Sequence, residues 1–437
     1  MPILQPNSTN YVHPWEPNLA DLHHVMQYNV LGQPILRTTL GPTATDAFGR
    51  FRVSHPYTLF DTFHRYQDTG KSSVYTTGTN STSTFDVNGC NIIMSVSTAS
   101  GAAVYRETNR VFAYQPGKSL LIQKTFCMGP EKPGLRQRIG YFDSNNGVFL
   151  ERDGSVVSFV LRSSSVDGTV QEKRAVKEEW NITTLDGTGA DKIVLDLSSS
   201  QIFYANIEWL GVGSVQCGFV INGQFIPCHV FHYANTPGST TTYMTTACLP
   251  VRSEIQNTAT TTSTSQLREI CSTVISEGGY ELIGRPLSIG HTLNGPYRLG
   301  SVNTLYPVLT IRLKADRTGA IVLPKNFSLA PLTAANYRYQ IISGGVTSGG
   351  AWQSAGADSS VEYNTTATSL TGGTVLETGY ILATNQSSIS PALQNYPFAY
   401  QLERNTFTGV RFEFIIAVIT TAQNPEVVAS INWEEVT

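Results

Sequence analysis

Residues 201–235 read QIFYANIEWLGVGSVQCGFVINGQFIPCHVFHYAN, and this stretch decides the fold class of the chain. Apolar and polar side chains alternate along much of it, and successive side chains of a β-strand point to opposite faces. Residues 211–214 and the pair Asn222-Gly223 divide it into three segments, and Asn-Gly tolerates the positive φ angles of a tight type I′ hairpin. The stretch therefore predicts a three-stranded antiparallel meander whose apolar face a second sheet must cover.

Short runs of β-branched and aromatic residues continue on both sides of the meander, and turn residues separate them. Asp153-Gly154 joins two of these runs as a second hairpin. Residues 266–276 also fit a helical spacing, but their β-branched residues in an all-β setting favour a strand. We predict an all-β chain with a jelly-roll or concanavalin-like β-sandwich over residues 66–300 and a C-terminal β-sandwich layer or domain over residues 301–437.

The first 65 residues differ, because seven prolines interrupt any long regular element. We expect an extended arm with at most one short helix, which begins after Asn18. Ordering such a segment costs roughly 1 kcal/mol or more per residue in backbone entropy, so its apolar side chains need a surface to cover. We predict that this surface belongs to a neighbouring subunit; packing on the chain's own body is the alternative. The predicted docking residues are Trp15, Phe48, Arg50, Phe51, Arg52 and Phe60.

The composition of the chain argues against some classes of function. Charged residues make up 14% of the chain and hydrophobic residues 41%, and the net charge of −3 comes with no basic cluster, which argues against a nucleic-acid partner. No run of about 20 apolar residues predicts membrane insertion, and the N-terminus does not resemble a secretory signal. The six widely spaced cysteines favour reduced thiols, so we expect synthesis in a cytoplasm.

Motifs for catalysis or metal binding are weak. His229 and His232 follow Cys228, but residues three apart in a strand point to opposite sides, so we predict no metal site. The Gly-x-Ser-x-Gly, His-Glu-x-x-His and Walker patterns do not occur, and we predict no catalytic residues and no cofactor. A pair of carboxylates meeting in a groove stays open at this point. Trp209 and Trp352 are the candidates for stacking on a glycan.

Several segments together resemble a family of virion structural proteins of tailed bacteriophages, common among marine cyanophages. The resemblance spans about residues 27–306. The segments that carry it are DAFGRFRVS (46–54), YTLFD (57–61), YQPGKS (114–119), LRQRIGYF (135–142), IEWLGVG (207–213), GFVING (218–223) and SEGGY (276–280).

This resemblance implies a particle component and not an enzyme. We expect a structural protein at a peripheral position of the virion, such as a tail, collar or fibre element. A capsid decoration or cement protein of the head and a carbohydrate-binding receptor adhesin are the alternatives. The expected partners are other virion proteins and further copies of the chain, with a trimer favoured over a dimer, and in the adhesin alternative a host-surface glycan.

Overall fold

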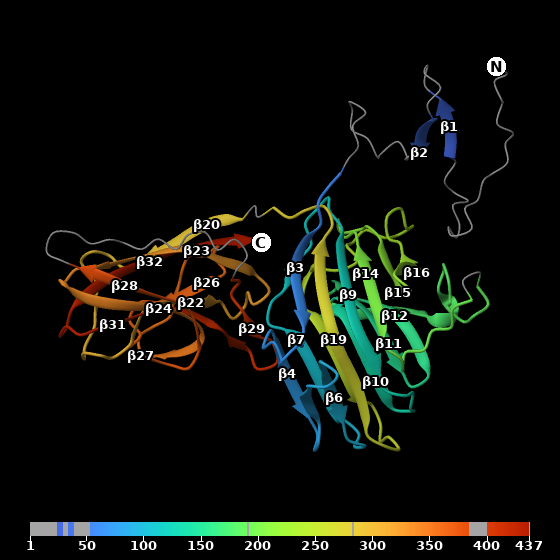
Figure 1. The fold of residues 1–437 in the computed structure, drawn as a ribbon, viewed down its shortest axis with the longest axis horizontal. Helices are drawn as coiled ribbons and strands as arrows, with labels where there is room; N and C mark the ends of the chain where they lie inside the picture. Colours follow the sequence, from blue (N-terminus) through green and yellow to red (C-terminus); the bar gives the residue numbers. More distant parts are fainter. Residues whose placement is uncertain are drawn as a thin grey trace. The chain divides into compact units, whose positions relative to one another are not determined.

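The computed structural model describes the backbone of residues 24–28 and 34–38, and residues 53–189, 192–281, 284–383 and 400–436. The chain divides into two compact units, Met1–His55 and Pro56–Thr437. In the first unit, strands β1 (His24–Tyr28) and β2 (Pro34–Thr38) form an antiparallel hairpin (Figure 1). The predicted docking residues Trp15, Phe48, Arg50, Phe51 and Arg52 lie outside the described residues, as does the beginning of the helix expected after Asn18. From His24 onward that segment forms β1 and not a helix.

The second unit begins with a sandwich of two antiparallel sheets (Figure 1). In spatial order, one sheet contains β13 (Thr169–Val176), β12 (Val156–Val166), β11 (Gly147–Asp153), β10 (Leu135–Phe142), β18 (Val251–Asn257), β7 (Ala103–Thr108) and β4 (Ser72–Thr77). The other contains β16 (Gln224–Phe231), β15 (Val215–Ile221), β14 (Gln201–Ile207), β9 (Leu120–Met128), β19 (Ser265–Ser276), β6 (Asn91–Val96) and β5 (Thr82–Asp86), and β3 (Tyr57–Phe63) also pairs with β19. The all-β prediction is confirmed.

The predicted meander is the run β14, β15 and β16. Asn222 and Gly223 connect the last two strands with φ angles of 53° and 77°, as a type I′ turn requires. Gly154, with a φ of 61°, lies in the turn between β11 and β12, which pair as the second predicted hairpin. The ambiguous residues 266–276 form most of β19 and lie between β9 and β6, so the strand interpretation is correct.

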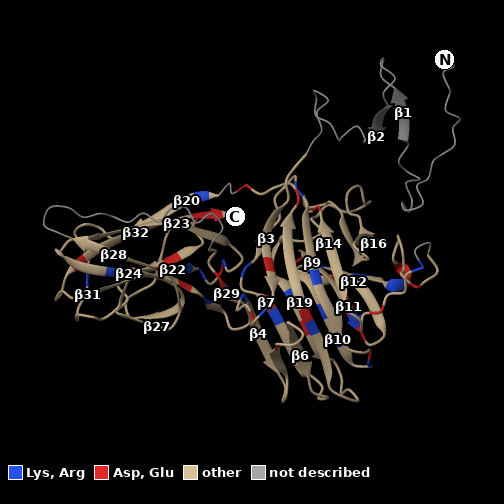
Figure 2. Cartoon of the chain, in the orientation of Figure 1, with Lys and Arg blue, Asp and Glu red and all other residues tan. Residues whose placement is uncertain are grey.

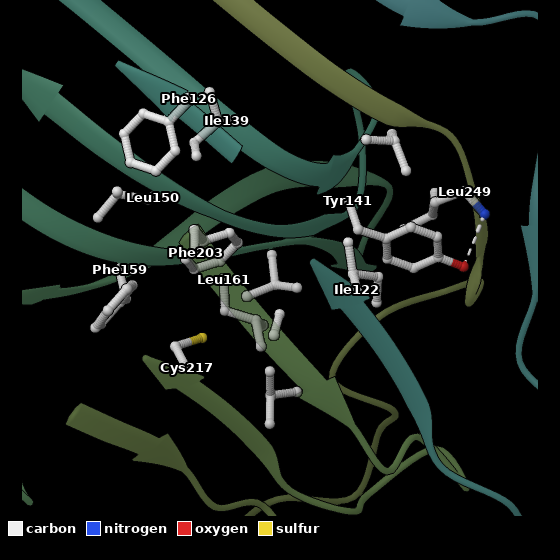
Figure 3. Packing of buried hydrophobic residues seen from close by; sticks show 14 of the residues in the cluster. Ile122, Phe126, Ile139, Tyr141, Leu150, Phe159, Leu161, Phe203, Cys217 and Leu249 are labelled. Atoms are coloured by element: carbon white, nitrogen blue, oxygen red, sulfur yellow. Dashed lines mark hydrogen bonds between the residues drawn. The ribbon is translucent and has the colours of Figure 1, made fainter. Parts of the chain in front are cut away.

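Aromatic and aliphatic side chains from both sheets fill the space between them (Figure 3). Tyr141 is a polar member of this core. Its hydroxyl group shares its proton between the carbonyl oxygens of Phe112 and Ala247 and accepts from the amide of Leu249 at 3.1 Å. These bonds satisfy a buried hydroxyl, which would otherwise destabilise the fold. The residues labelled in the figure are Ile122, Phe126, Ile139, Tyr141, Leu150, Phe159, Leu161, Phe203, Cys217 and Leu249.

Strand β3 comes from the region predicted to be an arm. It pairs with β19, with Phe60 opposite Val274. Because side chains alternate along a strand, Phe60 points into the core and is only 6% exposed, with its ring 4.9 Å from that of Phe112, whereas Phe63 is 55% exposed. Phe60 is therefore a core residue of the sandwich, in contrast to its predicted place among exposed docking residues. The body of the protein begins at Pro56 and not near residue 66.

A charged cluster is also buried between the two sheets. Glu269 on β19 accepts hydrogen bonds from Lys124 on β9 at 2.9 Å, from Arg106 on β7 at 3.3 Å and from Ser253 on β18 at 2.6 Å. Arg106 also makes two hydrogen bonds, of 2.6 and 2.7 Å, to the carboxylate of Asp68. The cluster thus pairs two cations with two carboxylates and links four strands across the core.

The strands that follow form a second sandwich. This sandwich has its own apolar core, which includes the buried Trp433. One sheet is formed by β20 (Arg285–Gly290), β32 (Glu426–Val436), β21 (Tyr297–Arg298) and β23 (Ile321–Pro331). The other is formed by β25 (Gln353–Ser354), β26 (Val361–Asn364), β22 (Tyr306–Leu313), β31 (Glu413–Thr420), β24 (Ala335–Ser348), β27 (Ser369–Thr371) and β28 (Thr374–Ala383). Because β20 and β21 pair with the C-terminal strand β32, this sandwich begins before the predicted boundary at residue 301.

The turn between β29 (Arg404–Asn405) and β30 (Val410–Arg411) contacts the first sandwich at β7 and β4. Thr406 donates from its hydroxyl group to Glu107 at 2.7 Å, and the ring of Phe407 lies 5.8 Å from that of Tyr75. Arg404 donates to the carbonyl oxygen of Asn109 at 3.2 Å. These contacts place the turn over the outer face of the sheet that contains β7.

Candidate functional site

Four segments that carry the family resemblance meet at one end of the first sandwich, although about 220 residues of sequence separate the first from the last. Strand register brings them together, because Ser276 lies opposite both Tyr57 of β3 and Leu120 of β9, and Leu120 lies opposite Ile207 of β14. We call this the motif end. It is formed by residues 57–61, 114–119, 207–213 and 276–280.

Hydrogen bonds and stacked rings join these segments. Ser119 donates to the carboxylate of Glu277 at 2.6 Å and accepts at its carbonyl oxygen from the amide of Glu277 at 2.9 Å. The rings of Tyr57 and Tyr280 stack at 6.1 Å. A Cβ atom on Gly278 would lie 2.6 Å from the Lys118 side chain, so the close approach of these two turns favours glycine there. The motif end is thus a packed surface and not an open cleft.

Trp209 belongs to this end and takes part in its packing. Its ring meets that of Tyr114 edge-on at 6.3 Å, and its indole nitrogen donates to the carbonyl oxygen of Met244 at 3.3 Å. The side chain is half-buried, so only part of the ring could face a sugar. Trp352, the other predicted stacking residue, lies in the second sandwich with the guanidinium group of Arg312 at 3.7 Å from its ring. The structure does not bring the two tryptophans into one site.

Several strands of the sheet that runs from β13 to β4 carry Lys, Arg, Asp and Glu residues (Figure 2). Those that alternate with the core residues point to the outer face of the sheet. We call this set the charged layer. Its ion pairs are Glu107 with Arg252 at 2.9 Å, Glu151 with Arg138 at 2.6 Å, Glu172 with Arg162 at 2.7 Å and Glu254 with Arg138 at 3.5 Å. Below these groups lie the buried side chains of Phe142, Phe149 and Val160.

Every carboxylate of the charged layer has an arginine partner. For Glu172, burial alone would raise the pKa, but the hydrogen bond and charge of Arg162, together with Arg138 and Arg174, hold the pKa below its ordinary value. Glycoside hydrolysis by two carboxyl groups requires one of them to stay protonated as the general acid. The arginine partners of Glu172 favour its charged form instead, which is the opposite of what a general acid needs.

An open groove of about 430 Å³ lies between β12, β13 and the segment that follows β16. Tyr233 stacks on Tyr243 with ring centres 4.7 Å apart, and the ammonium group of Lys173 lies 4.9 Å from the centre of the Tyr233 ring. Burial raises the pKa of Tyr233 to about 12, so its hydroxyl group stays protonated at neutral pH. The groove is lined by Leu161, Ser163, Ser165, Val166, Gln171, Glu172, Lys173, Tyr233, Ser239, Thr241, Thr242 and Tyr243.

The sequence interpretation did not find this groove. The charges around Lys173 alternate in sign, a pattern that is typical of a solvated face. The two walls of the groove are about 60 residues apart in sequence, and neither carries a motif. Lys173 and Tyr233 become neighbours because the two sheets pack face to face, with β13 at the edge of one and β16 at the edge of the other.

The two histidines that follow Cys228 lie in different environments. His229 is buried and accepts a hydrogen bond from the amide of Asn181 at 3.3 Å, while the exposed His232 contacts the Ser214 hydroxyl at 3.0 Å. In the described part of the chain, no group of three or more His, Cys, Asp or Glu side chains could hold a metal ion.

The described residues form no helix that is long and apolar enough to cross a membrane. All six cysteines are free thiols.

No family model and no curated protein matches this chain. Among solved structures, a β-glucanase of Bacillus licheniformis matches over 51% of this chain and 99% of its own, with 12% identity and a TM-score of 0.31. The carbohydrate recognition domain of Emp47p matches over 54% and 100%, with 11% identity and a TM-score of 0.32. A β-1,3-glucanase of Mycobacterium marinum matches over 50% and 98%, with 11% identity and a TM-score of 0.31. Similarity at this level concerns the fold alone.

Proposed function

We propose that this protein is a non-enzymatic structural component of a tailed-bacteriophage particle at a peripheral position, such as a tail, collar or fibre element. The observation that carries the proposal is the motif end, where four segments of the family resemblance pack against one another. Strand β3 begins at this end with Tyr57. A surface of this kind suits attachment to another particle protein.

The charged layer supports the non-enzymatic part of the proposal. Its glutamates are paired with arginines, and loss of one partner would leave a charge buried without compensation. Such a layer stabilises a fixed arrangement of strands. It does not leave a carboxyl group free to donate or accept a proton during turnover.

Purified virions provide the test. We expect mass spectrometry to detect the protein in them and antibody labelling in electron micrographs to decorate the tail, collar or fibres. Labelling over the head would favour the alternative of a capsid decoration or cement protein. Absence of the protein from purified particles would reject both structural functions.

Self-association belongs to the same proposal. We propose that copies of the chain form a homo-oligomer, with a trimer favoured, through docking segments around Trp15, Phe48, Arg50, Phe51 and Arg52. Sedimentation equilibrium of the full chain measures the number of copies. A monomer at all concentrations would contradict this part of the proposal and leave the particle assignment standing.

Glycan binding by a receptor adhesin is the second candidate function, and the groove lined by Lys173 and Tyr233 favours it. The groove presents hydroxyl groups, an amide and an aromatic ring, which are the groups that bind sugars by hydrogen bonding and stacking. A glycan array probed with the full chain tests this candidate. Loss of binding in Trp209→Ala or Trp352→Ala, with unchanged folding, would place the contact at those rings instead.

A further inference from the structure

The groove lies at the side of the sandwich where both sheets end. Strand β13 is the terminal strand of one sheet and β16 that of the other. Lys173 on β13 is opposite Leu161 on β12, and Leu161 is a core residue. The side chain of Lys173 therefore points toward the second sheet, where its ammonium group lies 5.8 Å from the Phe231 ring centre and 4.9 Å from that of Tyr233.

Within the fold, the ammonium group of Lys173 contacts aromatic rings. Among the residues that the structure describes, no carboxylate lies within ion-pair distance of its ammonium group. Its neighbour Glu172 also borders the groove, but its carboxylate pairs with Arg162 and Arg174. Lys173 is exposed, and its ammonium group can therefore pair with an anion that enters the groove.

The rest of the lining supplies hydrogen bonds of a kind that sugars use. Tyr243 is buried and its hydroxyl group donates to the carbonyl oxygen of Glu208 at 3.1 Å, so this ring only supports Tyr233. Tyr233 is half-buried and keeps its proton at neutral pH. The polar side chains that accompany it are Ser163, Ser165, Gln171, Ser239, Thr241 and Thr242.

We propose that this groove binds a saccharide that carries a carboxylate, such as a hexuronic acid unit. Lys173 pairs with the carboxylate, while Tyr233 and the surrounding hydroxyl groups form hydrogen bonds with the sugar hydroxyls. The volume of about 430 Å³ lies within the range of small-molecule sites. This inference rests on the second candidate function and specifies its ligand class and position.

Calorimetric titration of the full chain at low ionic strength tests the proposal, with a methyl glucuronoside as probe and methyl glucoside as the neutral control. We expect Lys173→Met to weaken binding of the acidic sugar about tenfold or more, because a charge-assisted hydrogen bond is lost. Lys173→Arg should retain most of the affinity, and added salt should weaken binding of the wild-type chain. Lys177→Met is the matched control, since Lys177 lies outside the groove lining and its loss should change nothing.

Equal binding of both sugars, or unchanged affinity in Lys173→Met, would overturn the proposal. So would the absence of binding to the acidic sugar at millimolar concentration. The glycan array separates this failure from that of the adhesin function: binding of neutral glycans alone would retain an adhesin with a different site, and an array without any signal would reject both.

Discussion

The Nζ atom of Lys124 lies 2.9 Å from Oε2 of Glu269, and both side chains are almost completely excluded from water inside the sandwich. Lys124 is on β9, where its neighbours on the same face are Ile122 and Phe126. A lysine in such a place is stable only with an acceptor beside it, because transfer of an unpaired charge into the core costs several kcal/mol. The pair therefore makes the association of β9 with β19 specific.

Removal of the lysine tests this pair. We expect Lys124→Met to lower the free energy of unfolding by about 3 kcal/mol, since Glu269 would lose its lysine partner and keep Arg106, Ser253 and the nearby His64. Guanidinium denaturation measures the change. Arg285→Met is the matched control, because the ion pair of Arg285 with Asp358 is exposed and should contribute less than about 1 kcal/mol. Equal effects of the two substitutions would contradict the assignment.

Acid stability should depend on the same cluster. Burial alone would raise the pKa of Glu269 and of Asp68. Lys124 and Arg106 instead hold the pKa of Glu269 below its ordinary value of 4.5. Arg106 likewise holds the pKa of Asp68 below its ordinary value of 3.8. A lowered carboxyl pKa stabilises the fold above the unfolded pKa, and this contribution is lost as the pH falls through the folded pKa. We expect the free energy of unfolding to fall below about pH 5, and more shallowly in Glu269→Gln. Parallel pH profiles of the two proteins would refute this.

Two truncations separate the arm from the body. Deletion of residues 1–55 should leave the β-sheet circular dichroism and the unfolding midpoint of the body unchanged, because the body begins at Pro56. Deletion of residues 1–65 should lower the midpoint, because it removes β3 with the buried Phe60 and His64. If residues 1–55 carry the docking segment, the shorter deletion should also abolish incorporation into particles. Normal incorporation of that variant would contradict the docking role.

Trp209 and Trp352 should respond differently to truncation. Trp209→Ala removes a half-buried ring and an indole hydrogen bond to Met244, so we expect a loss of about 2 kcal/mol in the free energy of unfolding. Trp352→Ala removes a ring that stacks on Arg312, and we expect a loss of about 1 kcal/mol or less. Thermal unfolding of both variants measures the difference. A Trp209→Ala variant as stable as the wild type would show that this ring is free to bind a ligand.

Local sequence accounts for much of the first sandwich. The period-two alternation of residues 201–235 and the turn residues Asn222-Gly223 and Gly154 were sufficient to predict two hairpins that the structure contains. These signals are local, because alternation and positive φ angles are properties of neighbouring residues. The prolines around β3 concealed a short strand, since its partner β19 follows more than 200 residues later in the sequence.

Sequence patterns could not assign which charged side chains lie in the core and which lie at the surface. Lys124, Glu269 and Arg106 resemble ordinary surface residues in the sequence, and Lys173 belongs to a run that is typical of a solvated face. Their roles depend on pairing between strands that are far apart in the chain, and a shift of one residue in register would turn each side chain to the opposite face. The order of amino acids thus establishes that the chain forms turn-bounded strands. Long-range strand register, set by burial of the apolar faces, determines which charges enter the core and which remain available to a ligand.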